Sequence, residues 1–321
     1  MALELEKRRE PVRPPFVDWR EPPQPVSVKT ELIKLIRGFG LPELEEQLIL
    51  EIRRLPDEDT IPALLADLRD IDSGSDEMIS DKTVDQIFPM AKAFEPVAKK
   101  LAELGIPHGI GRNLGLRALM QKYEVHAMSL WEDEKLQELN DIDVVVHSTK
   151  TKAILLIKSL KDMKKQGLIE NLRFQTNYHK PYSLLKVKDG HFASGNLYIS
   201  FLIDGVEVEI FDDFYYLKDS SKSEFTRDDG ICLTHLDAQG KDTVGTDTIE
   251  TVTISKGLES VLLNCLHGYG TLLSYLLQAN ADAQKFPRTP GNGSYEKYYH
   301  RFQFAAVLVN LIRASGFVPH R

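Results

Sequence analysis

Two aspartates stand at the start of an apolar run in the segment 140–146, Asn-Asp-Ile-Asp-Val-Val-Val. Successive side chains of an extended chain point to opposite faces, so Asp141 and Asp143 would share one face of a strand. The valines that follow predict a strand buried on both sides. Neighbouring carboxylates repel one another unless a cation lies between them, and Mg²⁺ is the usual hard cation for such oxygens. The pair is a candidate metal site, although aspartates that merely cap a strand give the same pattern.

A third carboxylate is expected from a β-hairpin predicted between Leu197 and Phe211. Asp204-Gly205 is a strong tight-turn dipeptide, and the residues after it alternate between apolar and acidic. Glu207 and Glu209 would share one face of the second strand and would meet the aspartates if the two strands are neighbours. Three carboxylates so arranged form the oxygen-rich site that two-metal phosphoryl chemistry requires. The alternative is an ordinary amphipathic hairpin with solvated glutamates.

The elements that must position these acids follow one another in an informative order. A helix over 84–104 leads into a short strand over 106–111, and a second helix starts near Asn113. The Asp-x-Asp strand comes next, then a helix over 150–165, and then the hairpin. Across residues 84–215 this order resembles the nucleotidyltransferase superfamily, whose members place a glycine at the first strand end, Asp-x-Asp on the next strand and a third acid on a later one.

This resemblance implies an α+β fold, a nucleotidyltransferase-type mixed β-sheet flanked by helices. It also implies that Asp141 and Asp143 bind Mg²⁺ or Mn²⁺ and that Glu209 is the third acid. The implied activity is transfer of a nucleotidyl or phosphate-linked group from a nucleoside triphosphate such as ATP. The acceptor, a small molecule, a protein or RNA, is left open. Segments 111–117 and 208–211 resemble in part the LicD/fukutin group, whose Pro-Trp-Asp-Asp-Asp run is absent here.

The turn after the first strand departs from the family pattern. The resemblance places Gly111, Arg112 and Asn113 beside the nucleotide phosphates, where a helix N-terminus offers backbone N–H groups. The family usually has Gly-Ser or Gly-Gly there, whereas Arg112 follows the glycine in this chain. A forked guanidinium could neutralise phosphate, or it could mark an inactive turn. A catalytically inactive binding or scaffold module is therefore the second hypothesis, and a glycosyltransferase with an Asp-x-Asp motif is the third.

Composition limits the classes of partner and compartment. The chain has 321 residues and a net charge of −8, so no broad nucleic-acid footprint is expected. Cys232 and Cys265 are too few for a disulfide or metal framework and are predicted to be buried thiols. The sequence shows no signal peptide and no apolar run approaching the ~18 residues of a membrane span. These features predict a soluble, cytoplasmic protein.

Prolines, glycines and polar stretches divide the chain into four predicted parts. Residues 1–26 form a proline-rich, disordered arm, and residues 27–78 a module of three short helices, the third over 61–68. Residues 79–250 form the nucleotidyltransferase-like catalytic core, whose segment 218–247 is irregular or short-stranded. Residues 251–321 form a C-terminal helical bundle.

Two helices are predicted in that C-terminal part. The first runs over 255–277, and the second over 295–314. Helical spacing is the basis of the first, through an apolar stripe of Leu258, Val261, Leu262, Cys265 and Leu266.

Overall fold

A computed structural model describes residues 28–37, 42–55, 77–125, 141–178, 183–186, 191–285 and 293–317. The proline-rich arm, the third predicted helix (61–68) and most of the segment before Asp141 lie outside these residues. Within the described part, no helix is both long and apolar enough to cross a membrane.

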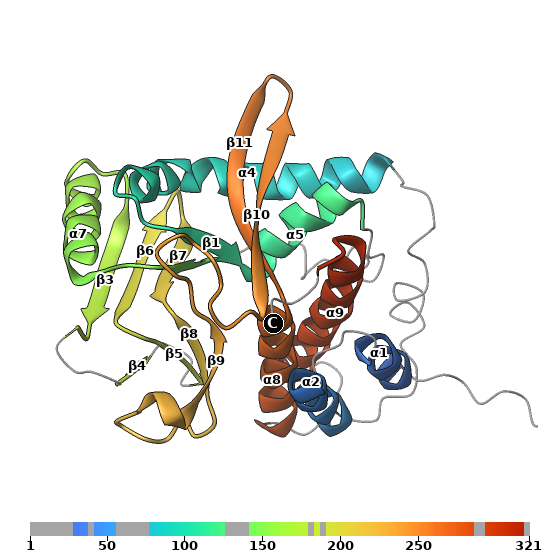
Figure 1. Cartoon of the computed structure of the whole chain (residues 1–321). Coiled ribbons are helices and arrows are strands. Elements are labelled where there is room, and N and C mark those ends of the chain that lie inside the picture. Colours follow the sequence, from blue (N-terminus) through green and yellow to red (C-terminus); the bar gives the residue numbers. More distant parts are fainter. Residues whose placement is uncertain are drawn as a thin grey trace, which may run out of the picture.

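A seven-stranded mixed sheet forms the centre of the molecule (Figure 1), with strand order β10-β11-β1-β2-β7-β6-β3. Its strands are β1 (His108–Gly111), β2 (Asp141–Val146), β3 (Glu170–Thr176), β6 (Leu197–Ile203), β7 (Val206–Asp212), β10 (Asp247–Lys256) and β11 (Glu259–Gly268). Strand β2 runs antiparallel to β1 and parallel to β7, and β1 runs parallel to β11. The sheet is therefore mixed, as expected for the α+β class.

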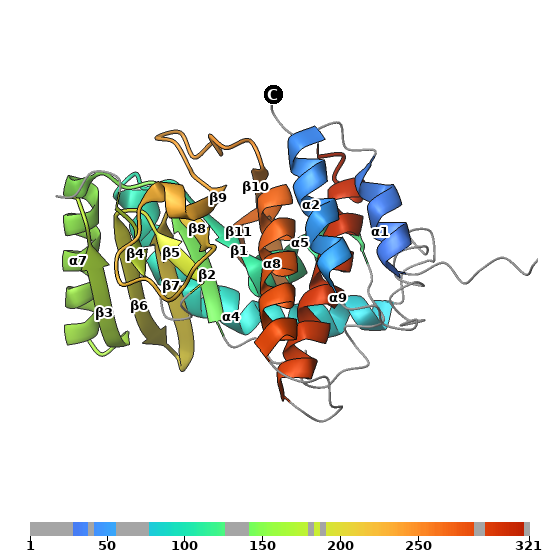
Figure 2. The same cartoon turned by 90° about the horizontal axis from the view of Figure 1, so that it is seen from below.

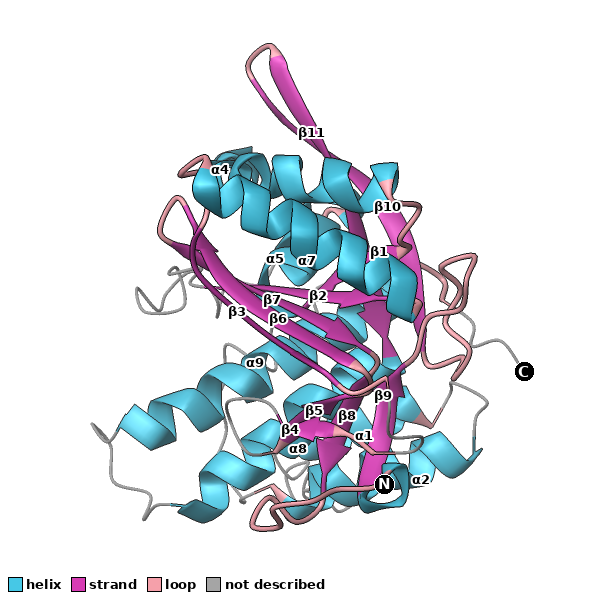
Figure 3. Cartoon of the chain, turned by 90° about the vertical axis from the view of Figure 1, so that its left-hand side faces the viewer, coloured by secondary structure: helices cyan, strands magenta, loops and turns pink. Residues whose placement is uncertain are grey.

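Seven helices have described bounds: α1 (Val28–Ile36), α2 (Pro42–Arg54), α4 (Glu77–Glu103), α5 (Arg112–Tyr123), α7 (Lys150–Lys165), α8 (Tyr269–Lys285) and α9 (Gly293–Ala314). Helices α4 and α7 lie on one side of the large sheet, and α8 and α9 lie on the other (Figure 3). Side chains alternate between the two faces of β2, and this agrees with the layering. Ile142 and Val144, which face away from Asp141 and Asp143, are fully buried.

A second sheet of four short strands packs beside α8 (Figure 2). It contains β4 (Leu185–Lys186), β5 (Phe192–Ser194), β8 (Phe214–Leu217) and β9 (Gly230–Thr234), with the 3₁₀ turn η2 (Arg227–Asp229) before β9. The prediction that 218–247 is irregular or short-stranded is confirmed.

Local sequence signals gave several elements correctly. The helix predicted over 150–165 is α7, and the helix predicted over 84–104 lies within α4 except at its last residue. The predicted hairpin is β6–β7, and its turn has positive φ at both central residues, 49° at Asp204 and 80° at Gly205. Such a turn matches the twist of the flanking strands, which is why Asp-Gly is a dependable hairpin signal.

The helix predicted over 255–277 is wrong for most of its length. Strands β10 and β11 form a ten-residue antiparallel ladder there, and α8 begins only at Tyr269. Burial alternates along β11, since Val261 and Leu263 are buried while Leu262 is 64 % exposed. Pairing of Ile110 with Cys265 places β11 beside β1, as the second strand from one edge of the large sheet. The hairpin end projects beyond α4 (Figure 1).

The four-part domain division stays a prediction. Helices α1 and α2 fall in the proposed N-terminal module, and α2 packs against α8 near the other end of the chain. The proposed boundary between residues 250 and 251 falls inside β10, so one strand contains residues of both parts. Cys265 is buried and Cys232 is half-buried, and both are free thiols.

Candidate functional site

The predicted acids meet because β2 and β7 are adjacent and parallel. Asp143 aligns with Glu209, and Asp141 aligns with Glu207. Aligned positions of neighbouring strands project to the same face, so these four carboxylates share one face of the large sheet. Gly111 at the end of β1 aligns with Asp143 on the other side of β2. The expected juxtaposition of strands is confirmed, while Glu207 lies beside Asp141 rather than one pleat away from both aspartates.

Arg112 supplies the positive charge of this acidic face. Its Nη1 lies 3.4 Å from Oδ2 of Asp143, and the two side chains are only 17 % and 6 % exposed. The guanidinium carbon lies 4.8 Å and 4.9 Å from the ring centroids of Phe192 and Phe214 in the small sheet. Aromatic faces attract a guanidinium, and more strongly where water is excluded. Arg112 thus bridges the two sheets.

The backbone at the start of α5 sets the position of this arginine. Gly111 has extended backbone angles and provides no side-chain cap for the helix. Arg112 follows with a φ of 51°, in the left-handed region that a residue with a β-carbon seldom occupies. Holding such a residue there costs on the order of 1 kcal/mol or more, which the surrounding contacts must offset. Asn113 continues the first turn of α5.

Burial and the acids have opposite effects on Arg112. Burial alone would lower the pKa of its guanidinium, but the nearby acidic groups, above all the carboxylates of Asp143 and Asp141, outweigh that effect and raise the pKa. The pKa of Glu209 is also raised, chiefly by burial, although hydrogen bonding from Tyr198 and the charge of Arg112 act in the other direction. The Tyr198 hydroxyl donates to Oε1 of Glu209 over 2.6 Å. Glu209 is therefore oriented by a neighbour on β6.

The donor chemistry of this face suits a hard divalent cation, because carboxylate oxygens are the ligands that Mg²⁺ and Mn²⁺ prefer. Within the described part of the chain, however, no group of three or more His, Cys, Asp or Glu side chains is gathered closely enough to hold a metal ion. One of the acids, Asp143, is engaged by Arg112. The residue types suit the ion, but to hold it this contact would have to open and the acids would have to come closer together.

A small cavity of about 20 Å³ adjoins the ion pair. Gly111, Arg112 and Asp143 line it together with Phe214 and Thr271. A volume of this size holds about one water molecule and no phosphate group. The turn at Gly111 is therefore closed to a ligand while Arg112 stays where it is.

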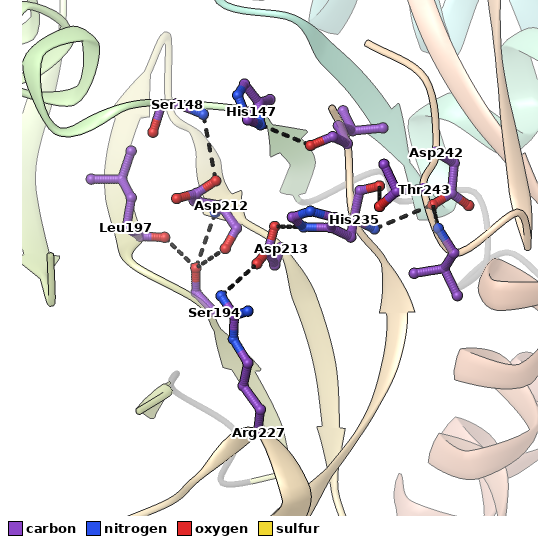
Figure 4. Close-up of polar contacts among 12 residues, drawn as sticks. His147, Ser148, Ser194, Leu197, Asp212, Asp213, Arg227, His235, Asp242 and Thr243 are labelled. Atoms are coloured by element: carbon purple, nitrogen blue, oxygen red, sulfur yellow. Dashed lines mark hydrogen bonds and ion pairs between the residues drawn. The ribbon is translucent and has the colours of Figure 1, made fainter. Parts of the chain in front are cut away.

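A second polar cluster lies at the opposite ends of the same two strands (Figure 4). Asp212 is the last residue of β7 and Asp213 follows it, and Ser148 lies just beyond β2. Asp213 is 2 % exposed and contacts Nδ1 of His235 and, at 3.6 Å, Nη2 of Arg227. The Ser148 backbone N–H donates to Oδ1 of Asp212 at 3.5 Å.

Sequence reasoning missed this cluster. Its one local signal was the Asp212-Asp213 pair at the end of the third-acid strand. The carboxyl ends of neighbouring parallel strands lie at one edge of a sheet, which is a frequent place for polar side chains to gather. His235 comes from beyond β9 and Arg227 from η2, and nothing in the local sequence links them to Asp213.

Burial changes the protonation of this cluster. It raises the pKa of Asp212 to about 7, with a further contribution from the charge of Asp213. The hydrogen bond to Asp213 raises the pKa of His235 above its ordinary value, although burial opposes that change. Gly195 is required beside these acids, because a β-carbon there would lie 2.7 Å from Oδ2 of Asp213. The contact between Asp213 and His235 connects the corner between β7 and β8 to the loop after β9.

Neither a protein-family model nor a curated protein matches this chain. Among solved structures, a Megavirus polyadenylate synthase aligns with 90 % of this chain and 45 % of its own, at 11 % identity and a TM-score of 0.33. The chain thus spans less than half the length of that protein. A likeness at this level establishes neither fold nor activity.

Proposed function

We propose that this protein transfers a nucleotidyl, or related phosphate-linked, group from a nucleoside triphosphate to an acceptor at the acidic face of β2 and β7. The observation that carries the proposal is the register that aligns Asp143 with Glu209 beside the turn at Gly111. Acids on adjacent strands next to a helix N-terminus combine cation ligands with a phosphate-binding backbone.

Each residue of the face has a distinct part in the proposed reaction. Asp141, Asp143 and Glu209 would hold Mg²⁺ or Mn²⁺, which when bound stabilises negative charge on the attacking and leaving oxygens. Gly111, Arg112 and Asn113 would receive the phosphates, since the first turn of α5 lacks a side-chain cap. The raised pKa of Glu209 also suits a group that accepts the proton of an acceptor hydroxyl.

A catalytically inactive binding module is the second candidate. The observation that favours it is the Arg112–Asp143 ion pair, in which the guanidinium already neutralises one of the acids. In that case the acidic face would be a structural remnant in which the guanidinium permanently replaces a metal. The two candidates differ in whether the ion pair opens.

Titration calorimetry with Mn²⁺ and each of the four nucleoside triphosphates tests the proposal. We expect metal-dependent binding of at least one nucleotide to the wild type and its loss in Asp141→Asn and Asp143→Asn. Asp162→Asn is the matched control, because Asp162 is an exposed carboxylate on α7 that pairs only weakly with Lys165. Absence of metal-dependent binding for all four nucleotides would leave the inactive module as the better explanation.

A further inference from the structure

Arg112 occupies the place in the acidic face where a cation is needed. It forms an ion pair with Asp143, and Asp141 and Glu209 also act on its guanidinium. Three carboxylates on one face of a sheet repel each other, so a single guanidinium among them lowers that repulsion. Arg112 therefore does in this conformation what a divalent cation would do with substrate present.

The aromatic rings of Phe192 and Phe214 fix the guanidinium in this position. They lie 4.9 Å apart, nearly parallel, and each is within 5 Å of the guanidinium carbon. Contact with two rings and one carboxylate leaves the side chain largely buried. A cation that approaches Asp143 from solvent must therefore displace a well-packed group rather than fill an open site.

Two features indicate that Arg112 has another position available. The residue lies at the junction of β1 and α5, and its left-handed φ of 51° is relieved if the turn changes conformation. A guanidinium also binds phosphate through parallel hydrogen bonds, so an arriving polyphosphate provides a partner as good as Asp143. The small adjoining cavity means that the phosphate cannot join the existing pair without moving the side chain.

We propose, on the basis of the function proposed above, that Arg112 couples cation and substrate binding by exchanging Asp143 for a substrate phosphate. Without substrate, Arg112 holds Asp143 and competes with the divalent cation. When a polyphosphate binds, the guanidinium moves to it and releases Asp143 for the cation. No covalent bond is made or broken in this exchange.

If this exchange occurs, removal of the Arg112 side chain has opposite effects on the affinities for the two ligands when each is added alone. A cation alone gains from removal of Arg112, because its competitor is gone. A polyphosphate alone loses from the same removal, because its partner is gone. A side chain with a merely structural role would weaken both ligands or neither.

Binding of Mn²⁺ alone and of inorganic tripolyphosphate with a chelator tests this prediction in wild type and Arg112→Asn. Asparagine tolerates the left-handed backbone, so the fold should be retained, as circular dichroism would verify. We expect Arg112→Asn to bind Mn²⁺ about tenfold more tightly and tripolyphosphate about tenfold more weakly, within the usual range of coupling between sites. Arg112→Lys keeps the charge but loses the planar fork, and should lie between the two.

Arg227→Gln is the matched control, because Arg227 also pairs with a buried aspartate, Asp213, at the far end of β7. It should change neither affinity. Addition of Asp143→Asn to Arg112→Asn should remove the gain in Mn²⁺ affinity.

Each outcome assigns failure to one of the two proposals. Equal Mn²⁺ affinity in wild type and Arg112→Asn, with loss in Asp143→Asn, overturns the exchange but leaves the cation site standing. Weaker binding of both ligands in Arg112→Asn also overturns the exchange and makes Arg112 structural. If no variant binds Mn²⁺ and Asp143→Asn changes nothing, the proposed function itself fails.

Discussion

The two ends of strands β2 and β7 both hold acids beside an arginine, but the acids are satisfied in different ways. At the far end, Asp213 contacts His235 and Arg227, and Asp212 accepts from the Ser148 backbone. These three partners come from three separate segments, so each contact also joins parts of the fold. At the near end, one guanidinium acts on Asp143, Asp141 and Glu209 together.

The difference shows which of these carboxylates can change its partner. A carboxylate held by several groups from distant elements cannot change partner without loosening those elements. Asp143, by contrast, is held by an arginine at the first position of a helix, next to a glycine. We therefore expect substitutions at the far end to reduce stability, and substitutions at the near end to affect ligand binding and turnover.

The largest effect is expected for Glu209→Gln at the near end. The change keeps the shape of the side chain and removes a charge, so pyrophosphate release from the nucleotide should fall on the order of 10²-fold or more. The free energy of unfolding should hardly change, because lost hydrogen bonding from Tyr198 is offset by weaker repulsion among the acids. Steady-state kinetics and urea unfolding measure both effects. Full turnover in this variant would remove Glu209 from the site.

Asp213→Ala at the far end should show the reverse pattern. It leaves His235 and Arg227 without their buried partner. The free energy of unfolding should fall by about 2 kcal/mol. Loss of a fully buried pair would cost more, but both cations here are partly exposed. Mn²⁺ binding should be unchanged. Urea unfolding with calorimetry would separate the two ends, and a loss of Mn²⁺ affinity here would contradict the comparison.

The far end should also make stability depend on pH. The pKa of Asp212 is about 7 in the folded protein and near 3.8 when unperturbed, so the folded state binds an extra proton between these values. This stabilising contribution is complete below the unfolded pKa and is lost as the pH rises through about 7. Relative to Asp212→Asn, the wild type should lose about 2 kcal/mol between pH 5 and pH 7. Unfolding free energies of the two proteins, measured as a function of pH, check this prediction. Parallel profiles would contradict it, because they would mean that Asp212 is ionised throughout.

Glu207→Gln is expected to have the smallest effect. Glu207 aligns with Asp141 near the start of β7, and Glu209 rather than Glu207 lies opposite Asp143. Pyrophosphate release should fall by roughly threefold to tenfold, since removal of a more distant charge weakens cation binding only in part. If Glu207→Gln is inactive and Glu209→Gln is normal, the third acid has been assigned one position too far along the strand face.

The sequence by itself determined the elements whose signals are local. The apolar run after Asp143 gave β2, alternation gave β7, and the Asp204-Gly205 turn gave the hairpin. These signals also put Asp141 and Asp143 on one face, because the direction of neighbouring side chains follows from the backbone alone. The stripe from Leu258 to Leu266 misled because spacings of three and four residues occur in strands as well, when exposed leucines such as Leu262 interrupt the alternation.

Which cationic side chain contacts which carboxylate depends on the tertiary structure. The β2–β7 register, the rings of Phe192 and Phe214 around Arg112, and the contact of His235 with Asp213 all join residues far apart in the sequence. An arginine after a glycine looks the same in the sequence whether its guanidinium binds a carboxylate or a phosphate. Only the packing of the small sheet against the turn at Gly111 placed the guanidinium on Asp143, because its burial against two stacked aromatic rings depends on strands that the local sequence does not specify.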